Sequence, residues 1–264
     1  MNYEYLCNQT IELAKEVGDY ILQKRGSIIN QEIETKGKHN FVTEVDKFAE
    51  EKLINGLGKL ITTSGFIAEE GTNTKIGEKY NWIIDPLDGT TNYIHGAPPF
   101  AISIALMEND KLAIGVILEI TYNECFYAFK DSPAFLDGKE IKVSSTKTVN
   151  DSLIATGFPY HNFQRLKPFM ETLDYFFNNS HGVRRLGSAA TDLAYVACGR
   201  YDAFYEYNLN PWDVAAGSFI LKQAGGKLAD FKGGTNYIFG KEMVATNSKI
   251  FEEFLGIVGK LMNK

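Results

Sequence analysis

The stretch that decides the fold is Asn81-Trp82-Ile83-Ile84-Asp85-Pro86-Leu87-Asp88-Gly89-Thr90-Thr91-Asn92. Its apolar start predicts a buried strand that ends at Asp85, because Pro86 donates no ladder hydrogen bond and biases the residue before it toward extended geometry. Asp88-Gly89-Thr90 then adds a second carboxylate, a residue free to take unusual dihedrals, and a hydroxyl. Two carboxylates three residues apart on a stiff turn repel each other unless a cation lies between them, and Mg²⁺ prefers such oxygen ligands. An ordinary Asp-Gly turn is the competing interpretation, but the strand, the proline and both acids in sequence favour a metal site.

Composition and charge exclude several classes of protein. The chain has 264 residues and can bury a large core in one or two domains. A formal charge of −6 disfavours a general nucleic-acid binder, and the longest apolar runs are too short to span a bilayer. Three scattered cysteines without a CxxC spacing indicate neither a disulfide framework nor a zinc site. We therefore expect a cytoplasmic protein with no nucleic-acid partner and no membrane association.

Hydrophobic periodicity predicts helices and strands in both halves of the chain. Apolar residues at helical spacing indicate a helix over 3–25, and Thr43 followed by Asp46 resembles a capping box that opens a second helix. Strands are expected at 65–68, 100–107, 112–118 and 124–129, with Asp137-Gly138 as a hairpin signal further on. The second half alternates strands with helices, two of which are expected to open at Ser188 and at Asn210-Pro211.

These elements predict a mixed α/β (α+β) fold in layers. The polar, aperiodic stretch after the hairpin is the expected domain boundary. We predict an N-terminal α+β domain over 1–140, which carries the acids of the opening stretch, and a C-terminal α/β domain over 141–264.

Two further acidic positions extend the candidate site. The short strand over 65–68 ends in Glu69-Glu70, and two nearby strands that both end in acids favour a shared site over two solvated charges. Asp213 falls in the first turn of the helix opened at Asn210, where the helix dipole stabilises a carboxylate. Simple helix capping is the competing interpretation of Asp213.

Other motifs carry less weight. Asp85-x-x-Asp88-Gly89-Thr90 nearly reproduces the Asp-x-Asp-Gly-Thr opening of haloacid-dehalogenase-type phosphatases, but the extra residue between the acids counts against a covalent aspartyl mechanism. Residues 234–241 miss the phosphate-binding loop pattern, and no G-x-G-x-x-G follows a strand. The four histidines are isolated and are not expected to act as catalytic bases. Arg184-Arg185 is expected to be a solvated strand end, with a partner-facing patch as the alternative.

Several segments together resemble the inositol monophosphatase family. The stretch 82–92 resembles the first signature of that family, and Trp212-Asp213-Val214-Ala215-Ala216-Gly217, continuing to Gly225-Gly226, resembles the second. Ile67-Ala68-Glu69-Glu70 matches the acidic strand end of the family, and Gly187-Ser188-Ala189-Ala190 matches its substrate-side helix start. The similarity runs in order over nearly the whole chain and looks like the bacterial branch. It implies the layered αβαβα sandwich of the sugar-phosphatase type, which belongs to the superfamily that includes fructose-1,6-bisphosphatase.

The resemblance also implies roles for individual residues. Two or three Mg²⁺ ions would be held by Glu69, Asp85, Asp88, Asp213 and the backbone carbonyl of Leu87. Glu69 and Thr90 would orient the attacking water, with Asp46 and Lys36 at the edge of the metal site. Phosphate oxygens would meet Gly89 and Thr90, and substrate hydroxyls would meet Asp88, Ala189 and Glu206.

The expected function is therefore Mg²⁺-dependent hydrolysis of a small polyol or sugar phosphate, with inositol 1-phosphate as the first choice. The resemblance implies that no phosphoenzyme forms, that lithium inhibits the reaction and that the protein is a homodimer. Alternative substrates on the same scaffold are fructose 1,6-bisphosphate, 3′-phosphoadenosine 5′-phosphate, histidinol phosphate and nucleotide phosphates. A regulatory binding protein on a phosphatase scaffold is the alternative from another class.

Overall fold

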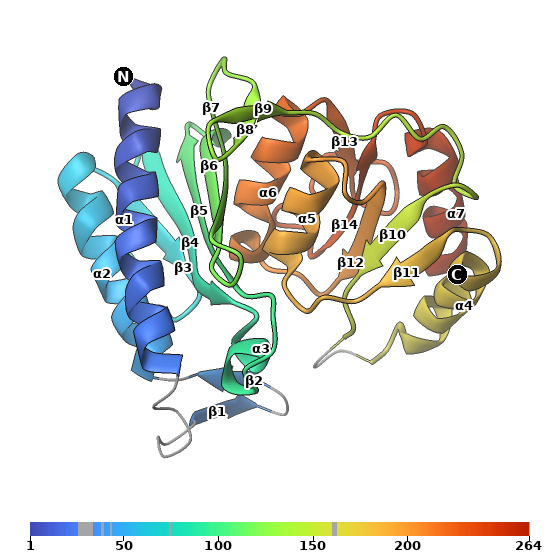
Figure 1. The fold of residues 1–264 in the computed structure, drawn as a ribbon, viewed down its shortest axis with the longest axis horizontal. Helices are drawn as coiled ribbons and strands as arrows, with labels where there is room; N and C mark the ends of the chain where they lie inside the picture. The colour runs from blue at the N-terminus through green and yellow to red at the C-terminus, as the bar shows by residue number, and fades with distance from the viewer. Residues whose placement is uncertain (26–33, 38–39, 43, 74, 160–162, 264) are drawn as a thin grey trace.

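The fold consists of five alternating layers of helices and sheets (Figure 1). A computed structural model describes residues 1–25, 44–73, 75–159 and 163–263, and the backbone alone of 34–37 and 40–42. Helices α1 (Tyr3–Lys24) and α2 (Glu44–Leu60) cover the outer face of a first sheet, and α5 (Ala189–Ala197) and α6 (Pro211–Gln223) lie between this sheet and a second one. Helices α4 (Leu166–Asn178) and α7 (Phe251–Met262) cover the outer face of the second sheet. The predicted αβαβα sandwich is confirmed.

The first sheet has seven strands in chain order and is mostly antiparallel. Its strands are β3 (Gly65–Ala68), β4 (Tyr80–Asp88), β5 (Ala101–Glu108), β6 (Lys111–Glu119), β7 (Glu124–Phe129), β8 (Ala134–Leu136) and β9 (Lys139–Ile141). Only the β3–β4 pair is parallel, so Glu69, directly after β3, lies near the C-terminal part of β4. Asp137 and Gly138 have positive φ angles of 48° and 79° between β8 and β9, as the predicted hairpin turn requires.

Strand β4 does not end where the sequence pattern placed its end. It continues past Asp85 and Pro86 to Asp88, and the pairing with β5 slips by one residue between Asp85 and Asp88. Such a bulge leaves a residue of the strand unpaired, which accommodates a proline inside the ladder. It also has a functional consequence: residues three apart on a regular strand face opposite sides, whereas here both acids line one cavity.

The second sheet mixes parallel and antiparallel strands in the order β11-β10-β12-β14-β13. Its strands are β10 (Leu153–Thr156), β11 (Gly182–Arg184), β12 (Ala203–Tyr207), β13 (Gly226–Ala229) and β14 (Glu242–Asn247). The short helix α3 (Thr90–Ile94) lies beside β2 (Asn40–Val42), which pairs with β1 (Glu34–Gly37) in an antiparallel hairpin. The predicted cap residue Thr43 lies outside the described residues.

Alternation along β4 explains how one strand serves two hydrophobic layers. Trp82 and Ile84 pack in the cluster formed with α1 and α2, whereas Ile83 packs in the cluster formed with α5 and α6. Helix α6 is tied to the first sheet by a hydrogen bond of 3.0 Å from Ser103 Oγ to the carbonyl of Trp212. Because α5 and α6 pack against both sheets, the division at residues 140 and 141 stays a prediction.

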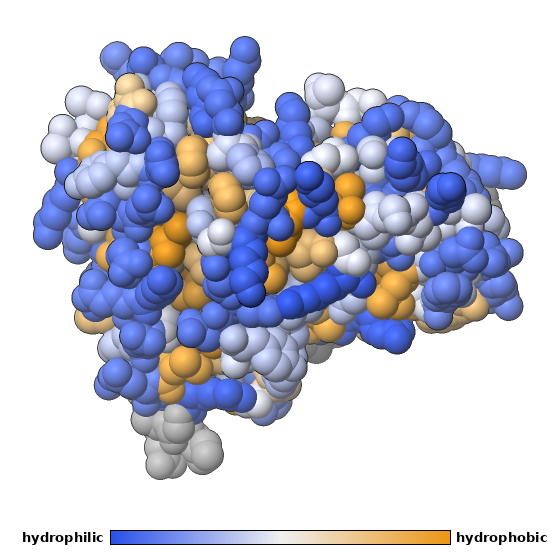
Figure 2. All heavy atoms as spheres, turned by 45° about the horizontal axis from the view of Figure 1, so that its top comes forward, coloured by the Kyte–Doolittle hydropathy of each residue, from blue (hydrophilic) through white to orange (hydrophobic). Residues whose placement is uncertain are grey.

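The surface of the molecule is largely hydrophilic on the face drawn in Figure 2, where apolar side chains gather only in small groups between charged ones. Among the described residues, no helix combines the length and the apolar character needed to cross a membrane.

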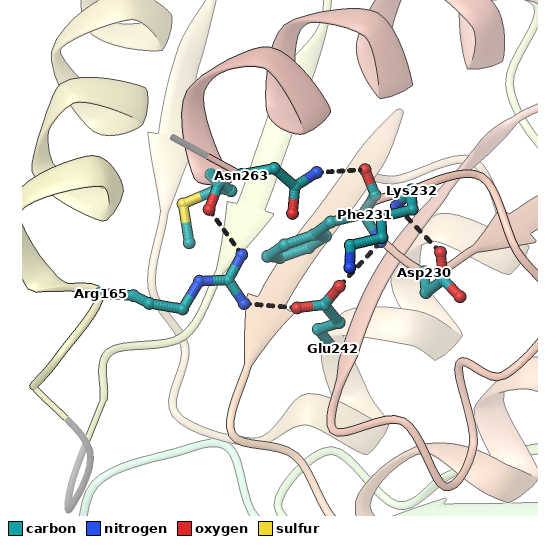
Figure 3. Close-up of polar contacts among 7 residues, drawn as sticks. Arg165, Asp230, Phe231, Lys232, Glu242 and Asn263 are labelled. Carbon is teal, nitrogen blue, oxygen red and sulfur yellow. Dashed lines mark hydrogen bonds and ion pairs between the residues drawn. The ribbon is translucent and has the colours of Figure 1, made fainter.

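A polar cluster on the far side of the second sheet ties α4 to the C-terminal helix (Figure 3). Arg165, just before α4, donates to the Glu242 carboxylate and, at 2.7 Å, to the carbonyl of Met262. The other oxygen of Glu242 accepts from the Phe231 N–H at 3.3 Å, and the guanidinium lies 5.1 Å from the Phe231 ring centroid. Each charge in this cluster therefore meets a partner of opposite sign or a hydrogen-bonding group.

Candidate metal and substrate site

Glu69 is brought to the site by the turn that follows β3. Its N–H donates to the carbonyl of Ile84 on β4 at 3.2 Å. The turn is fixed from α2 by the buried Glu50, which accepts from the N–H groups of Glu70 and Thr72 at 2.7 and 2.8 Å. Glu50 thus acts as a structural anchor, and Glu69, not Glu70, lines the cavity.

The end of β4 carries two acids whose positions are set by different donors. Asp85 is buried, and its Oδ1 accepts from the N–H of Leu87 two residues on at 2.9 Å. Asp88 reaches across to α5, where its Oδ2 accepts from Ser188 Oγ and from the N–H of Ala190, each at 2.7 Å. These bonds join the first sheet to the start of α5 across the cavity.

Ser188 performs two tasks at once. It is the N-cap of α5, as predicted, and its Oγ accepts from the Thr191 N–H at 3.2 Å. The same hydroxyl holds Asp88, so the helix start and the acid are positioned together.

Gly89 turns the chain from β4 into α3. Its φ of 96° is a left-handed conformation that glycine adopts without a steric penalty. The turn places Thr90 Oγ1 3.0 Å from the carbonyl of Leu87 and 3.2 Å from Oδ1 of the buried Asp46. The predicted catalytic residues Thr90 and Asp46 are therefore in contact, although Asp46 does not itself line the cavity.

Asp213 arrives from the opposite side, on the first turn of α6. Pro211 opens this helix as predicted, and an Asp213 carboxylate oxygen accepts from the Asn210 N–H at 2.6 Å. Helix capping and cavity lining are therefore both true of Asp213.

These elements enclose one cavity of about 180 Å³, larger than a single water needs. The predicted residues that line it are Glu69, Asp85, Leu87, Asp88, Gly89, Thr90, Ala189, Glu206 and Asp213. Lys36 lies in β1, and its side chain is outside the described part of the structure.

The acids of the cavity hold their protons to unusually high pH. Burial raises the pKa of Glu69 and of Asp85 well above the usual range. The negative charges of the neighbouring carboxylates raise both pKa values further. Burial also raises the pKa of Asp213 to about 7, with repulsion from Asp88 adding to the effect. The pKa of Asp88 rises to about 6 through burial, against the opposing influence of Ser188 and the start of α5. The site is therefore short of positive charge.

The chemistry of this donor set fits Mg²⁺, which binds carboxylate and carbonyl oxygens. Four crowded acids with raised pKa values are what a divalent cation would neutralise. Within the described residues, however, no group of three or more His, Cys, Asp or Glu side chains is already arranged to hold an ion. The assignment of metal ligands therefore rests on donor chemistry, burial and shared access to the cavity, and it stays a proposal.

Among the cavity residues that were not predicted as site residues, three bear directly on its chemistry. Asp192, in the first turn of α5, is buried at 1% exposure and lines the cavity. Gly157 lies so close to Glu206 that a Cβ there would be 2.0 Å from the carboxyl group of Glu206. Arg185 lines the cavity beneath the ring of Phe158, with 5.4 Å between guanidinium and ring centroid.

The prediction for Arg184-Arg185 is wrong in treating the two as one surface pair. Arg184 is exposed, but Arg185 lines the cavity, where burial raises the pKa values of Asp88, Asp192 and Glu206 and the positive charge of Arg185 limits that rise. The glycines at 157 and 187 were a signal in the sequence, because each leaves room for a neighbouring side chain. No sequence pattern, however, showed which side chains these are.

A layered fold with an acid-lined cavity between two sheets, built from the ends of β3 and β4 and the starts of α5 and α6, is a defined architecture among known proteins. The model of the inositol monophosphatase family matches residues 2–262. The chain belongs to this family, and its fold is the phosphatase fold of the family.

Individual relatives agree with this placement. The chain is 37% identical to Nus factor SuhB of Pseudomonas aeruginosa, over 95% of this chain and 94% of that protein. The crystal structure of the extragenic suppressor protein SuhB from Bartonella henselae is similar with a TM-score of 0.90 and 36% identity, covering 95% of this chain and 97% of that one. The structure of inositol monophosphatase from Anabaena (Nostoc) sp. PCC 7120 has a TM-score of 0.87 and 33% identity, covering 99% and 98%.

Proposed function

We propose that the protein is a Mg²⁺-dependent phosphomonoesterase that hydrolyses a small polyol or sugar phosphate, with inositol 1-phosphate as the first substrate. The observation that carries this proposal is the gathering of Glu69, Asp85, Asp88 and Asp213 around one cavity with too little positive charge to balance them. Membership of a phosphatase family supports the reaction type.

The proposed ligands of two or three Mg²⁺ ions are these four acids and the carbonyl of Leu87. When bound, the ions lower the pKa of water and neutralise charge on the attacking and leaving oxygens. The chain positions the reactants: Thr90 is held by Asp46 and by the Leu87 carbonyl, and Glu69 is the proposed acceptor of the water proton. The oxygen of that water would form a bond to phosphorus as the bond from phosphorus to the alcohol oxygen breaks, and the leaving oxygen would take up a proton from solvent, so no phosphoenzyme would form.

The substrate side of the cavity consists of α5 and the end of β12. The proposed phosphate contacts are Gly89 and Thr90, and the proposed contacts of the leaving alcohol are Asp88, Ala189 and Glu206. Glu206 is pressed against Gly157, which has no side chain to displace it. Lys36 is proposed at the edge of the metal site.

A panel of substrates at fixed Mg²⁺ concentration tests the choice of substrate. Phosphate release is measured from inositol 1-phosphate, fructose 1,6-bisphosphate, 3′-phosphoadenosine 5′-phosphate and histidinol phosphate. Preferred turnover of inositol 1-phosphate is the expected result. The nucleotide alternative draws support from a structural neighbour with 25% identity, SaIMPase-II, solved with 2′AMP bound. Faster turnover of another member replaces the substrate and keeps the reaction, and no turnover of any member overturns the proposal.

A binding role is the second candidate, because curated relatives at 37% identity are named Nus factor SuhB. A variant that lacks one proposed metal ligand, Asp85→Asn, separates the two roles: a binding partner retained from cell extract by both this variant and the wild type supports a role independent of turnover. Absence of any stoichiometric partner contradicts it.

Two further properties are proposed from the family. Lithium is expected to inhibit turnover, which a Li⁺ titration at fixed Mg²⁺ measures.

A homodimer is expected in solution, which light scattering after gel filtration measures.

A further inference from the structure

The most unusual acid of the cavity is one that the proposed mechanism does not use. Asp192 is 1% exposed, and its Oδ1 has no hydrogen-bond partner among the described residues. A buried polar atom without a partner costs free energy, so native proteins rarely keep one without a reason. Its place in the first turn of α5 gives a modest favourable interaction with the helix dipole, but the dipole supplies no hydrogen bond to Oδ1.

The surroundings of Asp192 point to a ligand with hydrogen-bond donors. Asp192 lines the cavity together with Glu206 and Asp88, and the charges of these two acids act on it. Arg185 is the only cationic side chain among the described residues that line the cavity, and its charge acts on all three acids. This wall therefore has more acceptors than donors, and groups that bring O–H donors complement it.

We propose that Asp192 is a specificity-determining residue that accepts hydrogen bonds from hydroxyl groups of the leaving alcohol, beside Glu206. The inference rests on the proposed function and adds to it a fourth alcohol-side contact. It explains why a buried carboxyl oxygen without a hydrogen-bond partner persists: the partner arrives with the substrate. A cavity that keeps such an acceptor selects alcohols rich in hydroxyl groups over alcohols that have none, because a substrate without donors leaves the carboxyl unpaired.

Two substrates and three variants test this proposal. The kcat/KM values for inositol 1-phosphate and for 4-nitrophenyl phosphate, whose leaving group has no further hydroxyl, are measured for wild type, Asp192→Ala and Asp192→Asn. For Asp192→Ala, we expect the ratio of the two values to fall by about 10- to 100-fold, the loss of one or two hydrogen bonds to a carboxylate, mainly through KM. For Asp192→Asn, the ratio is expected to lie between those of wild type and Asp192→Ala, because the amide oxygen still accepts a hydrogen bond.

The matched control is Asp174→Ala, which removes an exposed aspartate from α4 and is expected to leave the ratio unchanged. Melting temperature is the second measurement: removal of a buried acid with an unpartnered oxygen is expected to leave it equal or to raise it. An equal loss of kcat/KM on both substrates, or a melting temperature several degrees lower than that of wild type, would assign Asp192 a structural role and overturn the proposal. A wild type that turns over neither substrate is a different outcome, because it rejects the proposed function itself.

Discussion

Two carboxyl clusters in this molecule are constructed in opposite ways. Around Glu242, Arg165 supplies a guanidinium and Phe231 an N–H, so the carboxylate is paired within the chain (Figure 3). Around the cavity, Glu69, Asp85, Asp88 and Asp213 are held by N–H and hydroxyl donors and by one another, and burial raises all of their pKa values. A cluster that is complete within the chain stabilises the fold, whereas the cluster with unbalanced charge is where we propose that a cation and a substrate bind.

Neutralising one cavity acid is the strongest test of the difference between the two clusters. Asp85→Asn keeps the shape of the side chain and removes a proposed metal ligand. We expect phosphate release to fall by roughly 10³-fold or more, since bound metal contributes several kcal/mol of charge stabilisation in the transition state. Thermal stability should stay equal or rise, because mutual repulsion among the acids decreases. Asp110→Asn, a change at an exposed turn, is the control, and ordinary activity of Asp85→Asn would contradict the metal site.

The pH dependence of stability distinguishes the cavity acids from ordinary ones. In protein freed of cations, Asp88 has a pKa of about 6 and Asp213 of about 7, both above the ordinary 3.8. The folded state then binds more protons than the unfolded state between about pH 4 and about pH 7, so the free energy of unfolding decreases as pH rises through this window. We expect a decrease in Tm on the order of 5 °C.

Scanning calorimetry in EDTA and in excess Mg²⁺ measures this effect. Magnesium should reverse the trend, because it binds the deprotonated carboxylates and stabilises the folded state. Asp213→Asn should flatten the profile in EDTA. A Tm in EDTA that rises over the same window would show that these acids are not stabilised in their protonated form.

For the paired cluster around Glu242, we expect a substitution to lower stability and to leave turnover nearly unchanged. Arg165→Ala should lower the free energy of unfolding by about 2 kcal/mol, because it leaves Glu242 and the Met262 carbonyl without their charged partner. Turnover at saturating substrate should stay close to that of wild type. Urea unfolding measures the first effect, and Arg165→Lys, which keeps the charge but loses the planar fork, should recover only part of it. A large loss of turnover without loss of stability would contradict the assignment.

The smallest expected effect lies at the link between the helix start and the cavity. Ser188→Ala removes the N-cap of α5 and a donor to Asp88. We expect a loss of about 1 kcal/mol in stability, and the pKa of Asp88 should rise further because a donor to its charged form is lost. Urea unfolding and NMR titration of Asp88 in metal-free protein measure the two effects, with Ser188→Thr as the conservative control. No change in either would contradict the double role of Ser188.

Local sequence was sufficient for the layers and for several element ends. Ser188 capped α5, Pro211 opened α6 and Asp137-Gly138 formed a hairpin turn, because each of these depends on a few neighbouring residues. The end of β4 was misplaced because a bulge, which depends on the partner strand, absorbs Pro86. Asp192 and Gly157 could not be found in this way, since their importance arises from cavity walls that meet only in the folded chain.

The direct test of the central claim is phosphate release from inositol 1-phosphate followed in one sample through three conditions. Mg²⁺ is present first, EDTA is then added, and excess Mg²⁺ is finally restored. Our account predicts turnover that stops with EDTA and returns with Mg²⁺, while Asp85→Asn remains inactive throughout. Turnover that continues unchanged in EDTA, or that Asp85→Asn retains, would contradict the claim that the unbalanced acids of the cavity hold the catalytic metal.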